Sequence, residues 1–412
     1  TRRLKIKSMP QLFEMRYQSN GMKIFSCIVI FIFLLPYSAS VYKGLTSVCS
    51  ILLNIDERVC MIMIAVASAV VLVLGGYMAT AVNDLIQGIV MLFGIVLVIA
   101  AVLANNGGFI DAIGQLAQIE SVEAVTAGQP GAYTSFFGPD PLNLLGVVLL
   151  TSLGTWGLPQ MVHKFYAIKS EKAVYTGTII STFFALIVAG GSYFLGGFSR
   201  LYDSPAIYDA AGNIVYDSII PTMLSTLPDV VIGVVIMLVL SASMSTLASL
   251  VLTSASTLTL DFIKGTVVKD LSEKKQMIWL RVLVAVFLLI SVILAIDPPT
   301  FIAQLMGISW GALSGAFLAP FLYGLYWKRT TRAAVWASFA TGVGITVANM
   351  FIGFIDSAIN AGAITMLVSL IIVPVVSLLT KPLPKEQIEQ SFACYEEKVT
   401  VARKYQLRHD DK

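Results

Sequence analysis

The sequence has little charge. Only 12% of its 412 residues are Asp, Glu, Lys or Arg, whereas 57% are hydrophobic. Soluble globular proteins carry about 25% charged residues. The hydrophobic residues also gather in runs near the length that crosses a bilayer, which is about 20 residues for a helix. This composition argues against a water-soluble globular protein and predicts an all-helical integral membrane protein.

Residues that bind metals and cofactors are also scarce. The chain has two histidines and four cysteines, with no Cys-x-x-Cys pair, so zinc has no ligand set. Three of the cysteines fall in or beside hydrophobic runs, where we expect them to act as small buried apolar residues. No P-loop is present, which argues against an ATP-driven pump. The net charge of +3 gives no sign of nucleic-acid binding. We therefore expect neither an enzyme nor a cofactor.

The hydrophobic runs predict about ten membrane-spanning helices. They cover residues 22–53, 58–77, 84–105, 141–162, 173–201, 228–263, 275–296, 299–327, 333–355 and 360–380. We interpret residues 1–21 as a connecting loop and residues 1–380 as one transmembrane domain. An amphipathic stretch, Phe109 to Ile119, follows the third span. The charged tail 381–412 is expected to contain a short helix, Lys385 to Tyr405.

Positive charge is distributed unevenly between the predicted loops. If the loop 1–21 is cytoplasmic and the spans alternate, the cytoplasmic segments hold 24 of the 27 Lys and Arg residues. These segments are 1–23, 163–172, 264–281, 328–332 and 381–412. Lys and Arg accumulate on the cytoplasmic side of membrane proteins. The distribution predicts a multi-pass protein of the cell membrane with residues 1–21 and the tail in the cytoplasm.

Asp84 is the clearest ionisable residue inside the predicted spans. A charge within the bilayer is costly, so such a residue is a functional candidate. It could be a carboxylate ligand for sodium or a proton carrier. It could equally cap the amino end of the third predicted span. The residues alone leave both interpretations open.

The sixth predicted span carries a dense stripe of hydroxyl residues between Ser241 and Ser254. Within it Ala242, Ser245 and Thr246 are spaced i, i+3, i+4 and so share one helical face. Their main-chain and hydroxyl oxygens would suit a hard, singly charged cation such as sodium. Close packing between helices is the alternative, because small and hydroxyl residues let membrane helices approach one another.

Other predicted spans carry helix-weakening residues. In the fourth span, Gly157 and Pro159 either break the helix, as in transporters that expose main-chain groups, or only kink it. In the eighth, glycines at positions 307, 311 and 315 predict a close-packing stripe, with Ser309 and Trp310 beside it. Pro36 interrupts the first span, next to Tyr37, whose buried hydroxyl needs a partner.

Three of these segments resemble, in the same order, the motifs of the sodium/solute symporter family, which includes proline, pantothenate and short-carboxylate permeases. They are Gly75-Gly76 through Asp84-Leu85-Ile86-Gln87, Gly157-Leu158-Pro159-Gln160, and Ser241-Ala242-Ser243-Met244-Ser245-Thr246-Leu247. The last is the most specific, and the resemblance extends from residue 1 to about residue 380. It implies the leucine-transporter type of helical bundle, in which five core helices are repeated in inverted orientation. Two core helices and an accessory helix would then precede Thr1.

The resemblance also implies ion ligands. Ala242, Ser245 and Thr246 match the ligands of the sodium site that the family shares. Some members bind a second sodium with a carboxylate and hydroxyls at the positions of Asp84, Ser245, Ala248 and Ser249. Here Ala248 lacks the hydroxyl, so we expect one sodium ion per transport cycle.

The solute is less defined. Proline permeases carry aromatic residues where Thr151 and Thr155 stand, which argues against proline. The Gly-Leu-Pro-Gln motif at residues 157–160 is more similar to the corresponding motif of pantothenate and carboxylate permeases. No cation lines the spans, so an anionic solute would have to use helix amino ends or main-chain N–H groups. The candidate substrate-binding residues are Tyr37, Thr151, Thr155, Trp156, Gln160, Ser309 and Trp310.

The resemblance thus implies a sodium-coupled symporter that imports a small organic solute, such as a carboxylate, a pantothenate-like compound, an amino acid or a sugar. Its partners would be sodium, that solute and the lipid bilayer, with no nucleic acid. Two alternatives remain open: a membrane sensor domain of the same fold, and a proton-coupled transporter that uses Asp84. A passive channel is disfavoured because no ring of charge or filter sequence is present.

Overall fold

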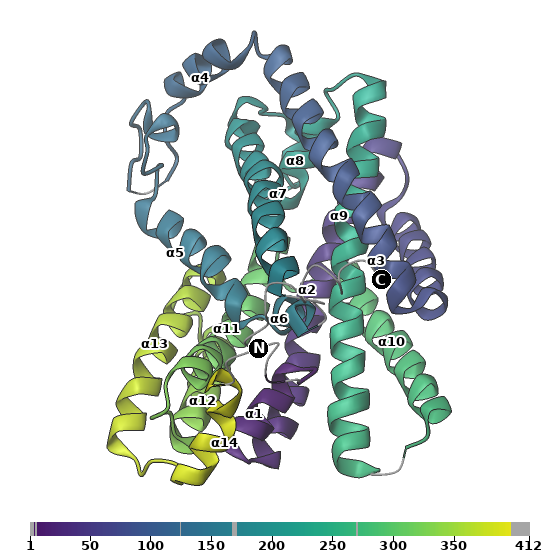
Figure 1. The fold of residues 1–412 in the computed structure, drawn as a ribbon. Helices are drawn as coiled ribbons and strands as arrows, with labels where there is room; N and C mark the ends of the chain where they lie inside the picture. The colour runs from purple at the N-terminus through teal and green to yellow at the C-terminus, as the bar shows by residue number, and fades with distance from the viewer. Residues whose placement is uncertain (1–3, 5, 124, 167–170, 269–270, 397–412) are drawn as a thin grey trace, which may run out of the picture.

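The computed structural model describes residues 4, 6–123, 125–166, 171–268 and 271–396. Within them the chain is helical apart from turns, loops and one isolated bridge between Tyr208 and Ile214. Figure 1 shows the arrangement. The elements are α1 (Met9–Tyr17), α2 (Asn20–Leu53), α3 (Glu57–Asn105), α4 (Phe109–Gln118), η2 (Ala132–Thr134), α5 (Pro141–Ser152), η3 (Gly154–Gly157), α6 (Pro159–Tyr166), α7 (Glu171–Gly197), η4 (Phe198–Leu201), η5 (Pro205–Ile207), α8 (Tyr216–Leu224), α9 (Asp229–Ser256), η6 (Thr257–Val267), α10 (Glu273–Ile296), α11 (Ile302–Tyr326), α12 (Arg332–Ile352), α13 (Ala358–Leu379) and α14 (Lys385–Glu396).

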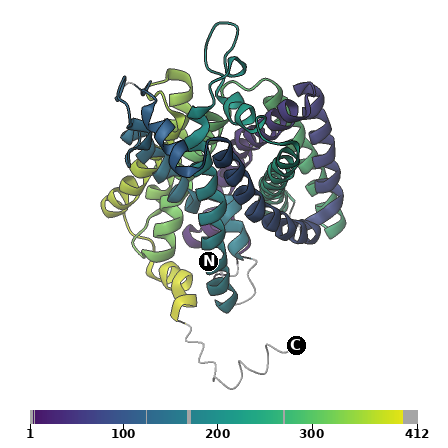
Figure 2. The same cartoon turned by 90° about the horizontal axis from the view of Figure 1, so that it is seen from above.

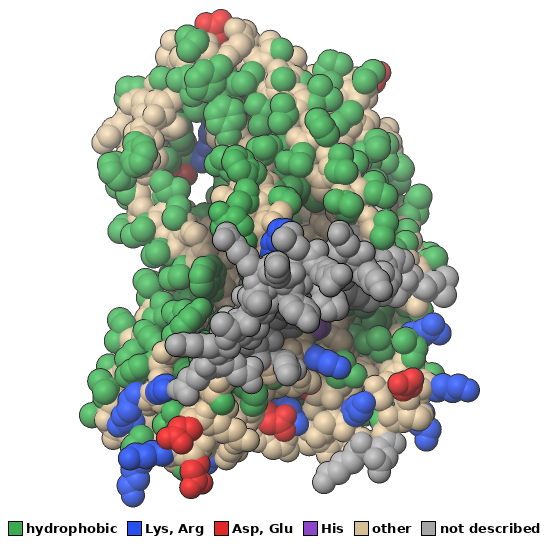
Figure 3. All heavy atoms as spheres, in the orientation of Figure 1, with side chains coloured by type: hydrophobic (Ala, Val, Ile, Leu, Met, Phe, Trp, Pro, Cys, Tyr) green, Lys and Arg blue, Asp and Glu red, His purple; other side chains and the backbone are tan. Residues whose placement is uncertain are grey.

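Eight helical segments among the described residues are long and apolar enough to cross a membrane. They lie in α2, the second part of α3, α7, α9 with η6, and α10 to α13. Apolar side chains cover much of the face seen in Figure 3. The prediction of an all-helical, multi-pass membrane protein is therefore confirmed. Ten spans are predicted and eight segments are counted among the described residues. The fourth predicted span is divided into short helices, and the second and third predicted spans lie in one helix, α3.

The second and third predicted spans form one continuous helix, α3, of 49 residues. At a rise of about 1.5 Å per residue, the length of α3 along its axis is about 74 Å, more than twice the thickness of the hydrocarbon core, which is roughly 30 Å. The segment between the two predicted spans, residues 78–83, contains neither proline nor glycine, and the helix continues through it. Figure 2 shows α3 along one edge of the bundle, on the side opposite α12 and α13.

Two further corrections concern the first 53 residues. The segment 1–21 is not only a loop, because it contains helix α1, whose amino end is capped by the Ser8 hydroxyl accepting from the Gln11 N–H. Pro36 does not interrupt α2, which continues as helix through it. Neighbouring helices and local adjustments satisfy the backbone groups that a proline frees in a membrane helix, so a proline is tolerated there.

The described part of the tail forms α14 (Lys385–Glu396), and the rest of the predicted helix, residues 397–405, lies outside the described residues. The Gln387 side chain donates to the Arg16 main-chain oxygen at 3.0 Å and accepts from the Arg332 guanidinium at 3.3 Å. The Arg16 guanidinium also lies 4.8 Å from the ring centre of Phe392. Helix α14 is therefore docked on α1.

Helix α11 is the most enclosed spanning helix, with 83% of its membrane window buried. A side chain built at Gly311 would meet the Gly362 Cα of α13 at 2.7 Å. One built at Gly315 would meet the Gly342 Cα of α12 at 3.1 Å. The predicted close-packing stripe is confirmed, since these backbones approach too closely for any larger residue.

Lys and Arg side chains gather at the lower end of the molecule in Figure 3, the end that carries α1, α14 and the loop between η6 and α10 in Figure 1. The structure thus separates a basic end from the rest of the bundle. That this end faces the cytoplasm stays a prediction from the positive charge.

Candidate functional site

The hydroxyl stripe lies in the middle of α9. The Ser245 hydroxyl donates to the Ala242 main-chain oxygen at 3.1 Å, and the Thr246 hydroxyl donates to the same oxygen at 2.9 Å. Three uncharged oxygen atoms therefore lie together on one turn of helix. Each hydroxyl uses its proton in these bonds and keeps its lone pairs for a cation.

Helix α3 packs beside this turn of α9. The Ser68 hydroxyl of α3 lies 3.3 Å from the sulfur of Met244, the residue directly before Ser245. Ala242, Ser245 and Thr246 are all half-buried, neither enclosed in the core nor open to the surroundings.

The second ion position that the resemblance implies is only partly represented on α9. Ser249 is half-buried, whereas Ala248 is buried with 6% of its surface exposed and supplies no oxygen from its side chain. Hydrogen bonds from Asp84 to either Ser245 or Ser249 are absent from the part of the chain that is described. The assignment of a second ion site remains a prediction.

Asp84 lies within α3, and not at its start. The structure thereby excludes the interpretation of Asp84 as a helix cap. Its Oδ1 atom is buried and has no hydrogen-bond partner among the described residues. Lys164 of α6 interacts with the Asp84 carboxylate electrostatically. A partnerless carboxylate oxygen at this depth is available to a proton or a cation.

The fourth predicted span is a broken helix. Helix α5 ends at Ser152, η3 covers Gly154–Gly157, Leu158 is extended (φ −83°, ψ 121°), and α6 starts at Pro159. Proline suits the first helical position because the missing N–H would have no partner there. A side chain at Gly157 would lie 2.9 Å from Leu318 Cβ of α11. The break therefore packs directly on α11.

Two of the candidate substrate residues touch each other, and others carry polar groups without partners. Tyr37 of α2 meets Trp310 of α11 edge to face, with ring centres 5.6 Å apart. Gln160 is 2% exposed, and neither polar atom of its side chain has a partner among the described residues. The same holds for the Ser309 hydroxyl, which is fully buried. Such groups call for an explanation, and a bound solute is one.

The remaining candidates are less enclosed. The hydroxyls of Thr151 and Thr155 are half-buried and donate to carbonyl oxygens of their own segment. Trp156 is 57% exposed, so the structure does not bring it together with the Tyr37–Trp310 pair. On α6, one turn after Gln160, burial lowers the pKa of His163, which leaves its imidazole neutral at pH 7.

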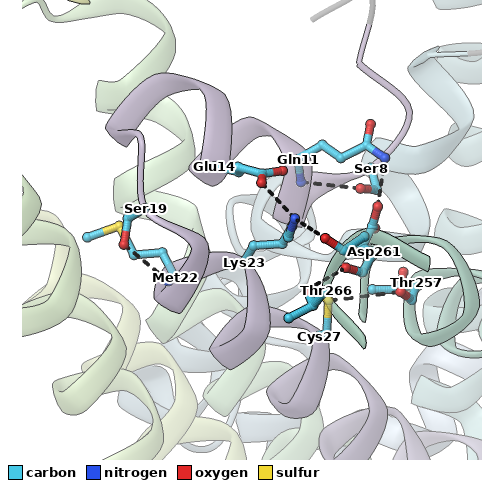
Figure 4. A network of polar contacts seen from close by, with 11 residues as sticks. Ser8, Gln11, Glu14, Ser19, Met22, Lys23, Cys27, Thr257, Asp261 and Thr266 are labelled. Carbon is cyan, nitrogen blue, oxygen red and sulfur yellow. Dashed lines mark hydrogen bonds and ion pairs between the residues drawn. The ribbon is translucent and has the colours of Figure 1, made fainter. Parts of the chain in front are cut away.

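One polar cluster, drawn in Figure 4, was not predicted from the sequence. Gln11 of α1, Lys23 of α2 and Asp261 of η6 lie together at the basic end of the bundle. A signal was present, because Asp261 is an ionisable residue inside the predicted span 228–263. Lys23 stands at the start of the predicted span 22–53, and its burial followed from no local pattern.

Comparisons with known proteins agree on one group. A family model described as the sodium:solute symporter family matches residues 2–342. The sodium/proline symporter of Haemophilus influenzae is 27% identical over 341 residues, covering 81% of this chain and 66% of that protein. The sodium/pantothenate symporter of the same organism is 24% identical over 335 residues, with the same coverage. The chain spans just under two thirds of the length of these relatives.

A solved structure of a Na+-coupled sialic acid symporter in a substrate-bound outward-open state superposes with a TM-score of 0.70. It shares 18% sequence identity and covers 93% of this chain and 79% of that chain. At this identity the likeness establishes the fold alone. The predicted helical bundle of the leucine-transporter type is confirmed by it.

Proposed function

Because this chain belongs to the sodium:solute symporter family, we propose that it carries the membrane core of a sodium-coupled symporter that imports a small organic solute by alternating access. The observation that carries the proposal is the cluster of Ala242, Ser245 and Thr246 oxygens on a half-buried face of α9. No covalent chemistry is required of the chain, and sodium is the only ion needed.

The chemistry of this cluster suits sodium. Transporters coordinate sodium with main-chain carbonyls and neutral oxygens in place of full charges. A multiply charged cation would favour several carboxylates, which this turn of α9 lacks. Binding and release of one sodium ion would draw on the membrane potential, about 2.3 kcal/mol per charge per 100 mV. Ala248 supplies no second hydroxyl, so one sodium ion per cycle is part of the proposal.

The solute would bind near Tyr37 and Trp310. Their edge-to-face pair supplies an apolar wall, and the unpartnered Gln160 and Ser309 groups offer hydrogen bonds. Aromatic walls with a few convergent polar groups are typical of small-molecule sites. No basic side chain belongs to this set, so an anionic group of the solute would have to be held by main-chain N–H groups such as those at the amino end of α6. A carboxylate or pantothenate-like solute fits these groups.

The test is uptake by the full-length protein in liposomes. Labelled pantothenate, short carboxylates, proline, sialic acid and sugars are supplied with an inward sodium gradient, and then with potassium in its place. We expect one solute class to accumulate with sodium only. Ser245→Ala with Thr246→Ala should abolish that accumulation, whereas Ser256→Ala, a hydroxyl deletion elsewhere on α9, should not.

Asp84→Asn separates sodium coupling from proton coupling. Retained sodium-driven uptake in this variant would show that protons do not pass through Asp84. Uptake that is indifferent to sodium but follows a pH gradient and is lost in Asp84→Asn would overturn the sodium proposal. The unpartnered Asp84 oxygen is the reason to include this arm.

A further inference from the structure

The end of the helix that carries the candidate sodium ligands has an unusual form. Helix α9 continues directly into η6, which is a π-helix of 11 residues. Long π-helices are rare, and π-helical turns are frequent at functional sites. Asp261 lies in this segment with 2% of its surface exposed. A buried carboxylate at the end of α9 therefore needs a reason.

Contacts tie this segment to both α1 and α2, as Figure 4 shows. The Gln11 amide of α1 donates to Asp261 Oδ1 at 2.6 Å. The Lys23 ammonium of α2 donates to the Gly265 main-chain oxygen at 3.4 Å and pairs with Glu14 of α1 at 2.6 Å. Lys23 is 4% exposed and also attracts Asp261 electrostatically. Three elements thus meet around two buried opposite charges.

Helix α1 is itself held from its other end. Arg16 donates from Nε to the Gly324 main-chain oxygen of α11 at 3.1 Å, and the Tyr17 hydroxyl donates to the Pro320 main-chain oxygen at 3.2 Å. Because α14 also docks on Arg16, α1 connects α11 and α14 to the end of α9. Movement of η6 relative to this frame must separate Lys23 from the Gly265 main-chain oxygen and Asp261 from Gln11.

We propose that Lys23, Asp261 and Gln11 form a latch that holds the end of α9 against α1 and α2, and that inward opening in the transport cycle requires the latch to release. The proposal rests on the transport function proposed above. Separating buried charges without hydration is costly, so the latch has two stable conditions: joined and dry, or parted and hydrated. These residues act on sodium binding through α9, as positioning residues, and do not ligate the ion.

Cys27 is a built-in reporter of this interface. Its side chain is fully buried, one turn beyond Lys23, with its sulfur 3.9 Å from the Thr257 main-chain oxygen of η6. Parting of η6 from α2 must expose this thiol to water. Replacing Cys49 and Cys60 by Ala and Cys394 by Ser leaves Cys27 as the only thiol of these 412 residues; any other cysteine of the full-length protein is replaced in the same way.

The experiment measures the rate at which a small maleimide labels Cys27 in the purified full-length protein, without sodium or solute. We expect Asp261→Asn, Lys23→Met and Gln11→Ala each to raise the rate at least tenfold. The matched control is Lys264→Met, which removes an exposed cation from the same π-helix. Gln11→Ala removes only a half-buried amide, so it reports on the latch even where the charge variants fail to fold.

A second readout separates a latch from a merely structural contact. Sodium should slow Cys27 labelling at least threefold in the single-cysteine protein with an intact latch and in its Lys264→Met variant. This protection should disappear in Lys23→Met and Asp261→Asn. Unchanged labelling in Gln11→Ala and the folded charge variants would overturn the latch, whatever the uptake assays show. Faster labelling in a protein whose uptake ignores sodium would instead retain the latch and defeat the sodium coupling.

Discussion

Helices α9 and α11 are built from similar residues but lie in different surroundings. Both are rich in small and hydroxyl side chains. In α11, 83% of the membrane window is buried, whereas in α9 the figure is 17%. The hydroxyl of Ser314 in α11 donates across to the Gly154 main-chain oxygen at 2.6 Å, and the Gly315 main-chain oxygen accepts from Ser338 and Ser369 of neighbouring helices.

The difference shows that a similar composition can serve two purposes, which are packing between helices and binding of a ligand. In α11 the small residues let backbones approach, and the polar groups are used up in contacts between helices. On α9, the Ser245 and Thr246 hydroxyls donate to the carbonyl of their own turn and to no other group among the described residues. Their free lone pairs on a half-buried face suit a ligand better than they suit packing. Four substitutions would break or sharpen this comparison.

The largest effect is expected for Gly342→Ala in α12. A Cβ atom at this position would overlap the backbones of Gly315 and Ala316 in α11, so the two helices would have to separate. We expect loss of monodisperse, folded protein in size-exclusion chromatography. Gly344→Ala is the matched control on the same helix, since its Cβ would meet nothing within 4 Å. Normal behaviour of Gly342→Ala would contradict the tight packing described for α11.

Gly157→Ala should have the next largest effect. The new Cβ would lie 2.9 Å from Leu318 Cβ and 3.0 Å from the Leu318 main-chain nitrogen, a backbone atom that has little room to move. Overpacking of this kind costs about 1–3 kcal/mol. Thermal unfolding should shift downward by several degrees, while Gly177→Ala on α7, which has open space, should not shift it. An unchanged midpoint would mean that the broken helix is not pressed against α11.

Ser245→Ala with Thr246→Ala should weaken sodium binding without much loss of stability. Removing two of three clustered oxygens is expected to lower sodium affinity at least tenfold, which corresponds to about 1.4 kcal/mol. The readout is the rise in melting temperature with sodium concentration, since a ligand that binds the folded state stabilises it. A full sodium response in the double variant would assign these hydroxyls to packing, as in α11.

Ser314→Ala is expected to have the smallest effect. It removes one hydrogen bond between α11 and the η3 segment, and such bonds in membrane proteins contribute about 0.6 kcal/mol on average. The midpoint of thermal unfolding should fall slightly more than in Thr341→Ala, whose hydroxyl donates to the Ala337 oxygen within its own helix. A large loss of transport activity with only a small change in stability would point to a role in transport for the contact between α11 and η3.

The sequence by itself determined the features that depend on local pattern. Hydrophobic runs of bilayer length predict α2, α7 and α10 to α13, because each such helix satisfies its own backbone hydrogen bonds. The i, i+3, i+4 spacing places Ala242, Ser245 and Thr246 on one face, because α-helical geometry is fixed. Family membership followed from three short motifs within these helices.

Only the tertiary structure decided which parts meet. Helix α1 forms in a polar segment that has no hydrophobic run, because Arg16 and Tyr17 find partners on α11. Gln11 and Asp261 are separated by 250 positions, and no local signal pairs them. Spacing places groups on a helix face, whereas burial and pairing depend on which neighbour that face meets. That choice belongs to the packing of the whole bundle.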